Sequence, residues 1–404
     1  MRLRTLDDLD DLAGRRVFVR VDLNVPLKDG VIADDTRVRA TVPTLAELLE
    51  RGASLVVASH LGRPKGQVDE AARMRPVAEA LAEVLGRVVE YVPTDGVLNA
   101  EVEQSCEALA FEPGRLVLLE NLRFDPGEEG DERAFALRLA SLADVYVDDA
   151  FGAVHRAHAS VSALPRAMLE QGRSAVAGRL LEREVAALSR LLDEPDRPYV
   201  AVLGGAKVSD KLATIGSLVE RVDALLIGGA MAFTFIAADG GQVGASLVEP
   251  DRFEGVRAAR ARADELGVMI QLPEDVVAAP EIAAEAPHHT VPSGEVPRGE
   301  KGLDIGPRAV EEFTRTIAEA RTILWNGPMG VFELEPFSAG TRGVATAIAG
   351  ARAFTVAGGG DSLAAVTKYG LGEGFDHLST GGGASLEFLE GRSLPGIAIL
   401  EEAE

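Results

Sequence analysis

The feature that most constrains the fold of this chain is a series of short apolar runs that are rich in β-branched residues. They recur over nearly all of the 404 residues: RVFVRVDL, SLVVAS, RLVLLE, VYVDD, YVAVLG, ALLIGG, VMIQL, TILWNG and FTVAGG. A strand with one face in solvent alternates apolar and polar residues, whereas these runs are apolar on both faces. They therefore predict parallel sheets that are covered on both sides.

Helical patterns lie between many of these runs. Residues 42–52 read VPTLAELLERG and end on Gly52, and residues 75–86 read RPVAEALAEVLG, with Pro76 early and Gly86 late. A proline near the start and a glycine at the end are typical of helix boundaries. The alternation of strands and helices indicates an α/β fold with right-handed crossovers.

The length of the chain predicts two domains of roughly 200 residues each, because a single core seldom grows larger. Residues 178–198 read as an amphipathic helix that stops at an acidic, proline-bearing turn, and a new strand follows directly. We expect a first domain at 1–177, a connecting helix at 178–198 and a second domain at 199–388. The predicted fold is two doubly wound, mostly parallel-sheet, Rossmann-like domains joined by a helix that serves as a hinge.

The charge of the chain limits its partners. With 41 basic and 64 acidic residues the formal net charge is −23, which argues against nucleic acids and anionic membranes as partners. Cys106 is the one cysteine, so no internal disulfide forms and a reducing compartment is expected. No apolar run reaches the roughly 18 residues of a membrane span, and the N-terminus lacks a signal-peptide pattern, so we expect a cytoplasmic protein.

Positive and polar side chains gather directly after the strand runs of the first half. In open α/β sheets ligands bind at the carboxyl ends of the strands. Arginine forks match phosphate and carboxylate groups, and several of them in equivalent positions favour a small, multiply anionic ligand. These residues are Arg20, Asp22, Asn24, Arg37, His60, Arg63, Arg123, His155 and Arg156.

In the second half, glycines replace arginines after the strands. Glycine-rich stretches precede helical patterns at LGGAKVSDK, LLIGGAMAF, TVAGGGDSLAA and LSTGGGASLEFL. Glycine lets backbone N–H groups approach an anion, and the positive end of a helix adds to the attraction. Lys207 and Lys211 stand four apart and would share one face of a helix, if a helix begins there. The pattern predicts a site for nucleotide phosphates.

Two common nucleotide motifs are absent from the sequence. It contains no GxxxxGK[ST] motif, and its first strand does not lead into GxGxxG, which argues against a P-loop protein and a Rossmann oxidoreductase. Asp361, just after Gly360, is suited to hold Mg²⁺ on a phosphate or to cap a helix, and both roles are compatible.

The order of these motifs resembles the phosphoglycerate kinase family. RVDLNVPL, SHLGRPKG, LLENLRF, DDAFGAVHRAHAS, LGGAKVSDK, GGAMAFTF, WNGPMGVFE, GGGDS and STGGGASLEFLEG follow one another over residues 20 to 391. The resemblance implies reversible phosphoryl transfer from 1,3-bisphosphoglycerate to ADP, which gives 3-phosphoglycerate and ATP, with Mg²⁺ as cofactor. It also implies a monomer whose C-terminal tail, residues 389–404, returns to the first domain.

The resemblance further implies which residues form the site. Those for 3-phosphoglycerate are Asp22, Asn24, Arg37, His60, Arg63, Arg123 and Arg156. Those for the nucleotide are Lys211, Gly306, Asn326, Glu333, Gly359, Gly360, Asp361 and Ser362, with Asp361 also the metal ligand. At the transferred group it implies Arg37, Lys207, Gly382 and Gly383. Lys65 receives no role and is expected to be solvated.

Two other functions compete with this interpretation. A dinucleotide-dependent dehydrogenase on the same architecture would need the glycine fingerprint and an acidic ribose partner about 20 residues later, and the sequence has neither. A non-catalytic scaffold with the same fold should have lost a lysine or arginine of the set, and all of them are present.

Overall fold

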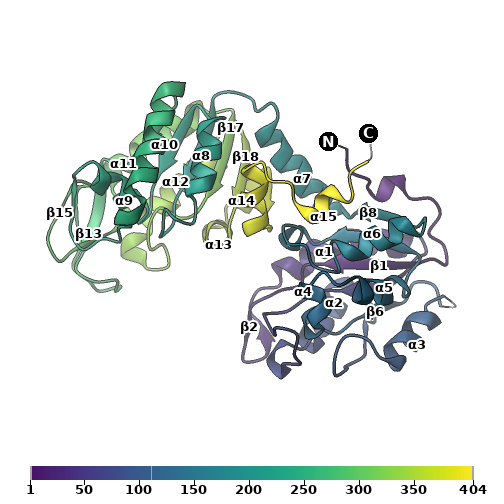
Figure 1. Ribbon diagram of the computed structural model, residues 1–404. Helices are drawn as coiled ribbons and strands as arrows, with labels where there is room; N and C mark the ends of the chain where they lie inside the picture. Colours follow the sequence, from purple (N-terminus) through teal and green to yellow (C-terminus); the bar gives the residue numbers. More distant parts are fainter. Residues whose placement is uncertain (1, 111, 403–404) are drawn as a thin grey trace. The chain divides into compact units, whose positions relative to one another are not determined.

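The computed structural model describes residues 2–110 and 112–402. The chain divides into two compact units. Unit 1 consists of residues 1–186 and 393–404, and unit 2 of residues 187–392 (Figure 1). In the described part of the chain each unit contains one six-stranded sheet in which all neighbouring strands are parallel.

The sheet of unit 1 has the strand order β5-β6-β4-β1-β7-β8. Its strands are β1 (Arg16–Val21), β4 (Ser54–Ala58), β5 (Glu90–Tyr91), β6 (Leu116–Leu118), β7 (Val145–Asp149) and β8 (Ser174–Ala177), and a small antiparallel ribbon joins β2 (Leu27–Lys28) to β3 (Val31–Ile32). Its helices are α1 (Thr36–Glu50), α2 (Arg75–Leu85), α3 (Ala100–Ala108), α4 (Pro126–Glu129), α5 (Arg133–Ala140), α6 (Ala163–Glu170) and α15 (Pro395–Ala398). The strands that follow β1 in the sequence, β4 to β6, lie on one side of it, and β7 and β8 lie on the other side. The direction in which strands are added therefore reverses between β1 and β7.

The sheet of unit 2 follows the same plan, with the order β12-β10-β9-β17-β18-β19. Its strands are β9 (Tyr199–Leu203), β10 (Ala224–Ile227), β12 (Met269–Gln271), β17 (Thr322–Asn326), β18 (Phe354–Gly358) and β19 (His377–Ser379). Smaller sheets pair β11 (Gln242–Val243) with β15 (Glu295–Val296), and β13 (Asp275–Ala279) with β14 (His289–Pro292) and β16 (Lys301–Ile305). Its helices are α8 (Leu212–Val219), α9 (Ala232–Ala238), α10 (Phe253–Leu266), α11 (Pro307–Glu319), α12 (Ala339–Ala349), α13 (Gly360–Tyr369) and α14 (Gly383–Leu389). Here the order reverses between β9 and β17.

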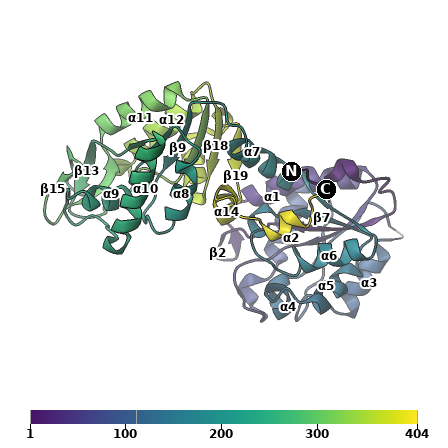
Figure 2. The ribbon, with the colours of Figure 1, turned by 45° about the horizontal axis from the view of Figure 1, so that its top comes forward.

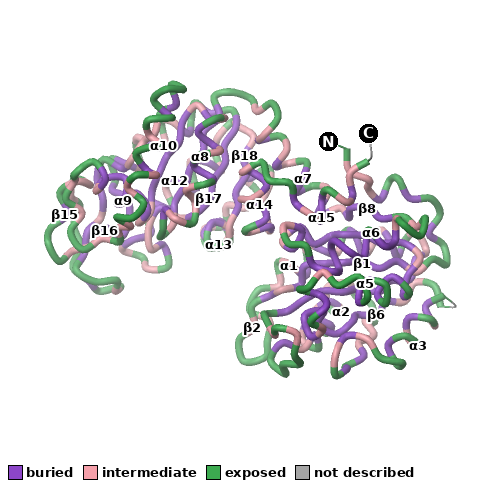
Figure 3. Tube along the Cα trace, in the orientation of Figure 1, coloured by how far each residue is buried: buried purple, intermediate pink, exposed green. Residues whose placement is uncertain are grey.

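The central strands are buried on both faces, as their apolar sequences predict. All residues of β4, β7, β9 and β17 are buried, and Figure 3 shows the buried residues running along the strands. On one face of the sheet in unit 1, apolar residues of α1 and α2 form a common core with β1 and β4. The predicted α/β fold with two doubly wound parallel sheets is confirmed.

The predicted connecting helix is shorter than the pattern suggested. Helix α7 covers Arg179–Leu192 rather than 178–198, because the segment DEPDRP contains two prolines and a helix cannot continue through it. The division between the two units falls within α7, after Ala186.

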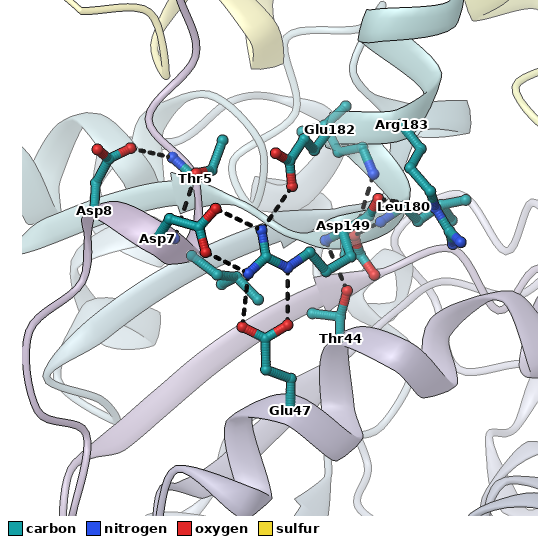
Figure 4. Close-up of polar contacts among 12 residues, drawn as sticks. Thr5, Asp7, Asp8, Thr44, Glu47, Asp149, Leu180, Glu182 and Arg183 are labelled. Carbon is teal, nitrogen blue, oxygen red and sulfur yellow. Dashed lines mark hydrogen bonds and ion pairs between the residues drawn. The ribbon is translucent and has the colours of Figure 1, made fainter.

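The first turn of α7 is fixed to unit 1 by charged side chains. Arg179 donates from Nε and Nη2 to the two carboxylate oxygens of Glu47, at 2.8 Å each, and from Nη2 to Asp7 Oδ1 at 2.6 Å. Asp149, the last residue of β7, accepts the backbone N–H groups of Leu180 at 2.8 Å and Leu181 at 3.2 Å through Oδ1. Figure 4 shows Asp7, Glu47 and Asp149 around this turn.

The C-terminal segment belongs to unit 1. The backbone N–H of Gly396 donates to Val154 O at 3.0 Å, Arg4 Nη2 donates to Ile399 O at 2.6 Å, and Leu3 and Glu401 form a β-bridge. In Figures 1 and 2 the yellow segment that carries α15 lies on unit 1. Within the described ranges, none of the helices combines the length and apolar character that a membrane span requires.

Candidate active site

In unit 1, three of the predicted residues meet where β1 ends. Arg37, in the first turn of α1, donates from Nη1 to Asp22 Oδ2 at 2.7 Å and to Asn24 O at 3.3 Å. The N–H of Asn24 donates to Asp22 Oδ1 at 3.2 Å. The reversal of strand order next to β1 opens the sheet here, and this is the position at which doubly wound sheets bind ligands.

The loop that follows β4 is held from several sides. Asn121, which is fully buried, donates from Nδ2 to Leu61 O at 2.7 Å and to Ala72 O at 2.9 Å, and so joins the two ends of the loop. Arg123 Nη1 donates to Gly62 O at 2.9 Å, and the N–H of Gly62 donates to Asn24 Oδ1 at 2.9 Å. The loop therefore presents Arg63 from a fixed backbone.

Two of the predicted arginines are exposed. The guanidinium of Arg63 has no carboxylate within ion-pair distance among residues 2–110 and 112–402. Arg156 is also exposed, and its Nε lies 3.1 Å from Nε2 of the neighbouring His155. Both guanidinium groups remain accessible to an anion from solution.

His60 and Arg123 are instead largely buried, and their electrostatics differ accordingly. Burial and the positive charges of Arg20, Arg123 and Arg37 hold the pKa of His60 well below its usual range, so its imidazole is neutral. Burial also lowers the pKa of Arg123, although Glu129 partly offsets the effect. The site thus combines exposed positive charge with a neutral imidazole.

The sequence predicts Arg20 among the strand-end residues for an anionic ligand, but in the structure its side chain is buried against other protein groups. Arg20 is 1% exposed, its Nη2 lies 3.1 Å from His60 Nδ1, and its Nε donates to Ser160 Oγ at 2.8 Å. A charged residue inside an otherwise apolar strand run was the only available signal, because its partners lie far away in the sequence.

In unit 2, a cleft of about 340 Å³ contains two of the predicted residues, Glu333 and Asp361. Its walls consist of backbone from the turns that follow the strands and of apolar side chains. The lining residues include Gly205, Ala206, Gly229, Ala230, Leu247, Ile282, Leu303, Pro328 and Val331. A flat apolar ligand with a polar tail fits such a cleft.

Lys211 lies next to the reversal point of this sheet. Its Nζ donates to Gly204 O at 2.8 Å, to Asn326 O at 2.7 Å and to Asn326 Oδ1 at 2.5 Å, which uses all three N–H bonds of the ammonium group. Burial lowers the pKa of Lys211 to about 8, against the opposing effect of Asp361. A phosphate can bind this lysine only if it replaces one of these oxygens.

The expectation that Lys207 and Lys211 share a helix face is wrong. Helix α8 begins at Leu212, and residues 205–211 form bends and turns, so Lys211 precedes the helix and Lys207 lies outside it. Residues 204–211 redirect the chain between β9 and α8, and Gly205 adopts φ +116° in this turn. Lys207 is exposed and is not among the residues that line the cleft.

The glycine-rich turns open two helices as predicted. Gly359 (φ +91°) precedes α13 and Gly382 (φ +54°) precedes α14, and a Cβ added at Gly360, Gly382 or Gly383 would meet no atom within 4 Å. Their backbones are therefore open to a ligand. Ser362 is buried, and its Oγ accepts the N–H of Gly327 at 2.6 Å.

The residues present fit a magnesium ion that is carried on phosphates. Asp361 is exposed at the start of α13 and lines the cleft. In the part of the chain that the structure describes, no group of three or more His, Cys, Asp or Glu side chains could form a complete metal site. A single carboxylate suits Mg²⁺, which usually takes one or two carboxylates and completes its shell with phosphate oxygens and water.

Gly306 has a packing role that the sequence did not predict. It precedes α11, it is buried, and a Cβ there would lie 2.3–2.5 Å from the carboxylate of Asp275, which accepts the N–H groups of Arg308 and Ala309. The same arrangement joins Gly178 to Asp149. Gly306 is not among the residues that line the cleft, and its contact with a nucleotide stays a prediction.

We expect Gly306→Ala to lower the free energy of unfolding by about 1–3 kcal/mol, because the added methyl displaces the carboxylate that caps α11. Gly216→Ala is the matched control, since that glycine lies in α8 with no atom near its missing Cβ. Chemical denaturation measures both. If Gly306→Ala is as stable as the unmodified protein, the packing explanation is wrong.

Comparisons with known proteins identify the family of the chain. A model of the phosphoglycerate kinase family matches residues 6–392. The chain is 55% identical over 410 residues to the phosphoglycerate kinase of Salinispora arenicola and 53% identical over 402 residues to that of Thermus thermophilus, in each case covering 99% of this chain and 100% of the relative. The solved structure of phosphoglycerate kinase from Coxiella burnetii is similar with a TM-score of 0.86 at 39% identity, over 99% of both chains.

Proposed function

The chain belongs to the phosphoglycerate kinase family, and from this premise we propose how its residues divide the work of the reaction. The reaction is the reversible transfer of a phosphoryl group from 1,3-bisphosphoglycerate to ADP, a step of glycolysis that gives 3-phosphoglycerate and ATP. The observation that best supports the division is the arginine-rich site at the strand ends of unit 1, in a chain of net charge −23.

Unit 1 binds 3-phosphoglycerate in this proposal. The exposed forks of Arg63 and Arg156 hold the phosphate that is not transferred, with Arg123 beside them, while Arg37 faces the carboxyl end. Asp22, which already accepts from Arg37, accepts the hydroxyl of the substrate, and Asn24 supports the same side. His60 donates a neutral hydrogen bond, because its pKa lies too low for it to be protonated.

Unit 2 binds the nucleotide. The cleft of about 340 Å³ takes the base between its apolar walls, and the glycine turns before α13 and α14 take the phosphates on their backbone N–H groups. Lys211 reaches a phosphate when it gives up one of its oxygen partners. The other residues of this part of the site are Gly306, Asn326, Glu333, Gly359, Gly360, Asp361 and Ser362.

The chemistry needs positioning and charge rather than proton transfer. The oxygen that receives or releases the phosphoryl group belongs to a carboxylate. With a pKa of about 4 this carboxylate is already ionised at neutral pH, so no general base is required. Arg37, Lys207 and the N–H groups of Gly382 and Gly383 stabilise the charge on the transferred group. Bound through Asp361, Mg²⁺ would supply charge neutralisation at the nucleotide phosphates.

The residues proposed for the two substrates lie in different units, so transfer requires that the units close on each other. Closure also excludes water, which would otherwise hydrolyse the acyl phosphate. We propose that α7 is the hinge, because it is the helix within which the division of the chain falls.

The enzyme is proposed to work as a monomer in the cytoplasm. Cys106 is buried, and burial raises the pKa of its thiol to about 12, so it stays a protonated thiol. Sedimentation at several concentrations tests the monomer: a mass that rises to twice that of the chain would contradict it.

A coupled assay of turnover with ATP and 3-phosphoglycerate tests the proposed function. Activity should depend on both substrates and on Mg²⁺. If turnover is absent although both substrates bind, the protein is a scaffold with this fold. Binding of NAD(H) in a fluorescence titration would instead support a dehydrogenase.

Arg63→Ala is expected to weaken the binding of 3-phosphoglycerate by about 10- to 100-fold, because the loss of a hydrogen bond to a charged group costs about 1.5–3 kcal/mol. Titration calorimetry measures this affinity directly. Lys65→Ala is the matched control, since Lys65 is exposed in the same loop and has no proposed contact. Unchanged affinity in Arg63→Ala would show that Arg63 is misplaced.

A further inference from the structure

A buried carboxylate without any assigned role lies beside the predicted substrate residues of unit 1. Glu128, in α4, is 0% exposed. The N–H of Ser160 donates to its Oε2 at 2.9 Å, and the hydroxyl of Ser160 donates to its Oε1 at 2.6 Å. His158 Nδ1 lies 4.0 Å from the same Oε1. Ser160 thus holds both oxygens of the carboxylate.

Ser160 links this carboxylate to Arg20. The Nε of Arg20 donates to Ser160 Oγ at 2.8 Å, and Arg20 Nη1 donates to Val21 O. Because the hydroxyl proton of Ser160 points to Glu128, its oxygen lone pairs are free to accept from Arg20. An ionised Glu128 accepts both hydrogen bonds from Ser160 and places a negative charge next to the link between Ser160 and Arg20.

The last step of the chain determines the protonation of His60. A guanidinium has only donors, so at 3.1 Å the Nη2 of Arg20 must donate to Nδ1 of His60. In a neutral imidazole with Nδ1 as the acceptor, the proton is on Nε2. The geometry therefore selects one of the two neutral tautomers and fixes the plane of the ring.

We propose that Glu128 and Ser160 are positioning residues, which act through Arg20 to hold His60 as the Nε2–H tautomer for the anionic substrate. The inference rests on the proposed function in one respect, namely that His60 contacts 3-phosphoglycerate. Glu128 acts as the counter-charge that keeps Arg20 in place, and Ser160 transmits the orientation. Burial raises the pKa of Glu128 above its usual value, and the charge of Arg20 and the hydrogen bonds from Ser160 only partly offset this shift.

The tautomer of His60 can be measured without any assay of activity. Nitrogen-15 NMR of the full chain, labelled at histidine, distinguishes a protonated Nε2 from a protonated Nδ1, and His60→Gln assigns the signals by their loss. We expect a single tautomer with the proton on Nε2 in the unmodified protein. A proton on Nδ1 would overturn the proposal without the need for any further variant.

Ser160→Ala removes the link between Glu128 and Arg20. We expect mixed tautomers of His60 and a KM for 3-phosphoglycerate about 10-fold higher, with kcat changed by less than about 3-fold. Ser160→Thr keeps the hydroxyl and should restore the single tautomer. The matched control is Ser162→Ala, because Ser162 is buried two residues further along but donates to Asp131 at 3.1 Å instead.

Three results contradict the inference: a single Nε2–H tautomer that persists in Ser160→Ala, the same spectral change in Ser162→Ala, or no recovery in Ser160→Thr. Glu128→Gln provides the second variant if Ser160→Ala does not fold, and it should give the same mixture. The proposed function fails separately, through the absence of turnover in the unmodified protein, and this leaves the tautomer measurement valid.

Discussion

Alanine at position 207 is expected to lower kcat about 10²- to 10³-fold, with a much smaller change in the KM for ATP. The removal of a single donor that is aimed at developing charge has a cost of this size in other enzymes. In phosphoryl transfer the charge spreads over the three equatorial oxygens, and a lysine ammonium at that position stabilises the transition state more than the ground state. Lys207 suits this role, since it is exposed in the turn after β9.

Steady-state kinetics with ATP and 3-phosphoglycerate separates this role from binding. Lys207→Arg is the control that keeps the charge, and it should recover part of the loss. Lys28→Ala removes an exposed lysine from the β2–β3 ribbon and should leave kcat unchanged. An unchanged kcat in Lys207→Ala, or an increase in KM alone, would contradict a role in the transition state.

The sequence was sufficient to predict the fold, and it placed the candidate site residues at strand ends. All residues of β4 and β7, and all of β1 after Arg16, are buried, so their apolar runs could be read without ambiguity. Because parallel strands end at the same edge of a sheet, Asp22 after β1 and His60 after β4 could be placed near each other. A hydrogen bond joins the two loops that follow these strands, between Asn24 and Gly62, which are 38 residues apart in the sequence.

The internal contacts of the site could not be predicted in this way. Ser160 and Arg20 are 140 residues apart, and Ser160 and Glu128 are 32 residues apart, so no local pattern relates them. The sequence indicated Lys211 as a contact for the nucleotide, yet three oxygens of the protein already surround its ammonium group. The missing information is tertiary: a polar group that enters a buried site must find partners there, wherever they stand in the chain.

The second large effect is expected at Asp149, the buried carboxylate that caps α7. Asp149→Ala leaves the N–H groups of Leu180 and Leu181 without their acceptor, and we expect the free energy of unfolding to fall by about 2–4 kcal/mol. Asp149→Asn keeps an oxygen at the place of Oδ1 and should cost far less. Chemical denaturation followed by circular dichroism compares the three proteins.

The pH dependence of the Asn variant provides a stricter test. Burial raises the pKa of Asp149 from 3.8 to about 7, and the hydrogen bonds that its carboxylate accepts only partly offset this shift. Between about pH 4 and pH 7 the folded protein holds a proton that the unfolded chain releases, so this carboxyl contributes less stability as the pH rises. Asparagine cannot ionise, and its stability relative to the unmodified protein should therefore increase through this window and level off above it.

The difference in the free energy of unfolding between Asp149→Asn and the unmodified protein cancels the titration of every group that the substitution leaves unchanged. The adjacent Asp148, whose pKa burial raises to about 6, is the group to control for. Asp148→Asn, measured in the same way, identifies the contribution of Asp148, because the pH range over which Asp148 affects stability ends near pH 6 rather than near pH 7. A stability difference between Asp149→Asn and the unmodified protein that stays constant from pH 4 to pH 8 would show that Asp149 ionises normally. The cap on α7 would then be an ordinary charged one, and the first turn of the proposed hinge would keep the same anchor across that range.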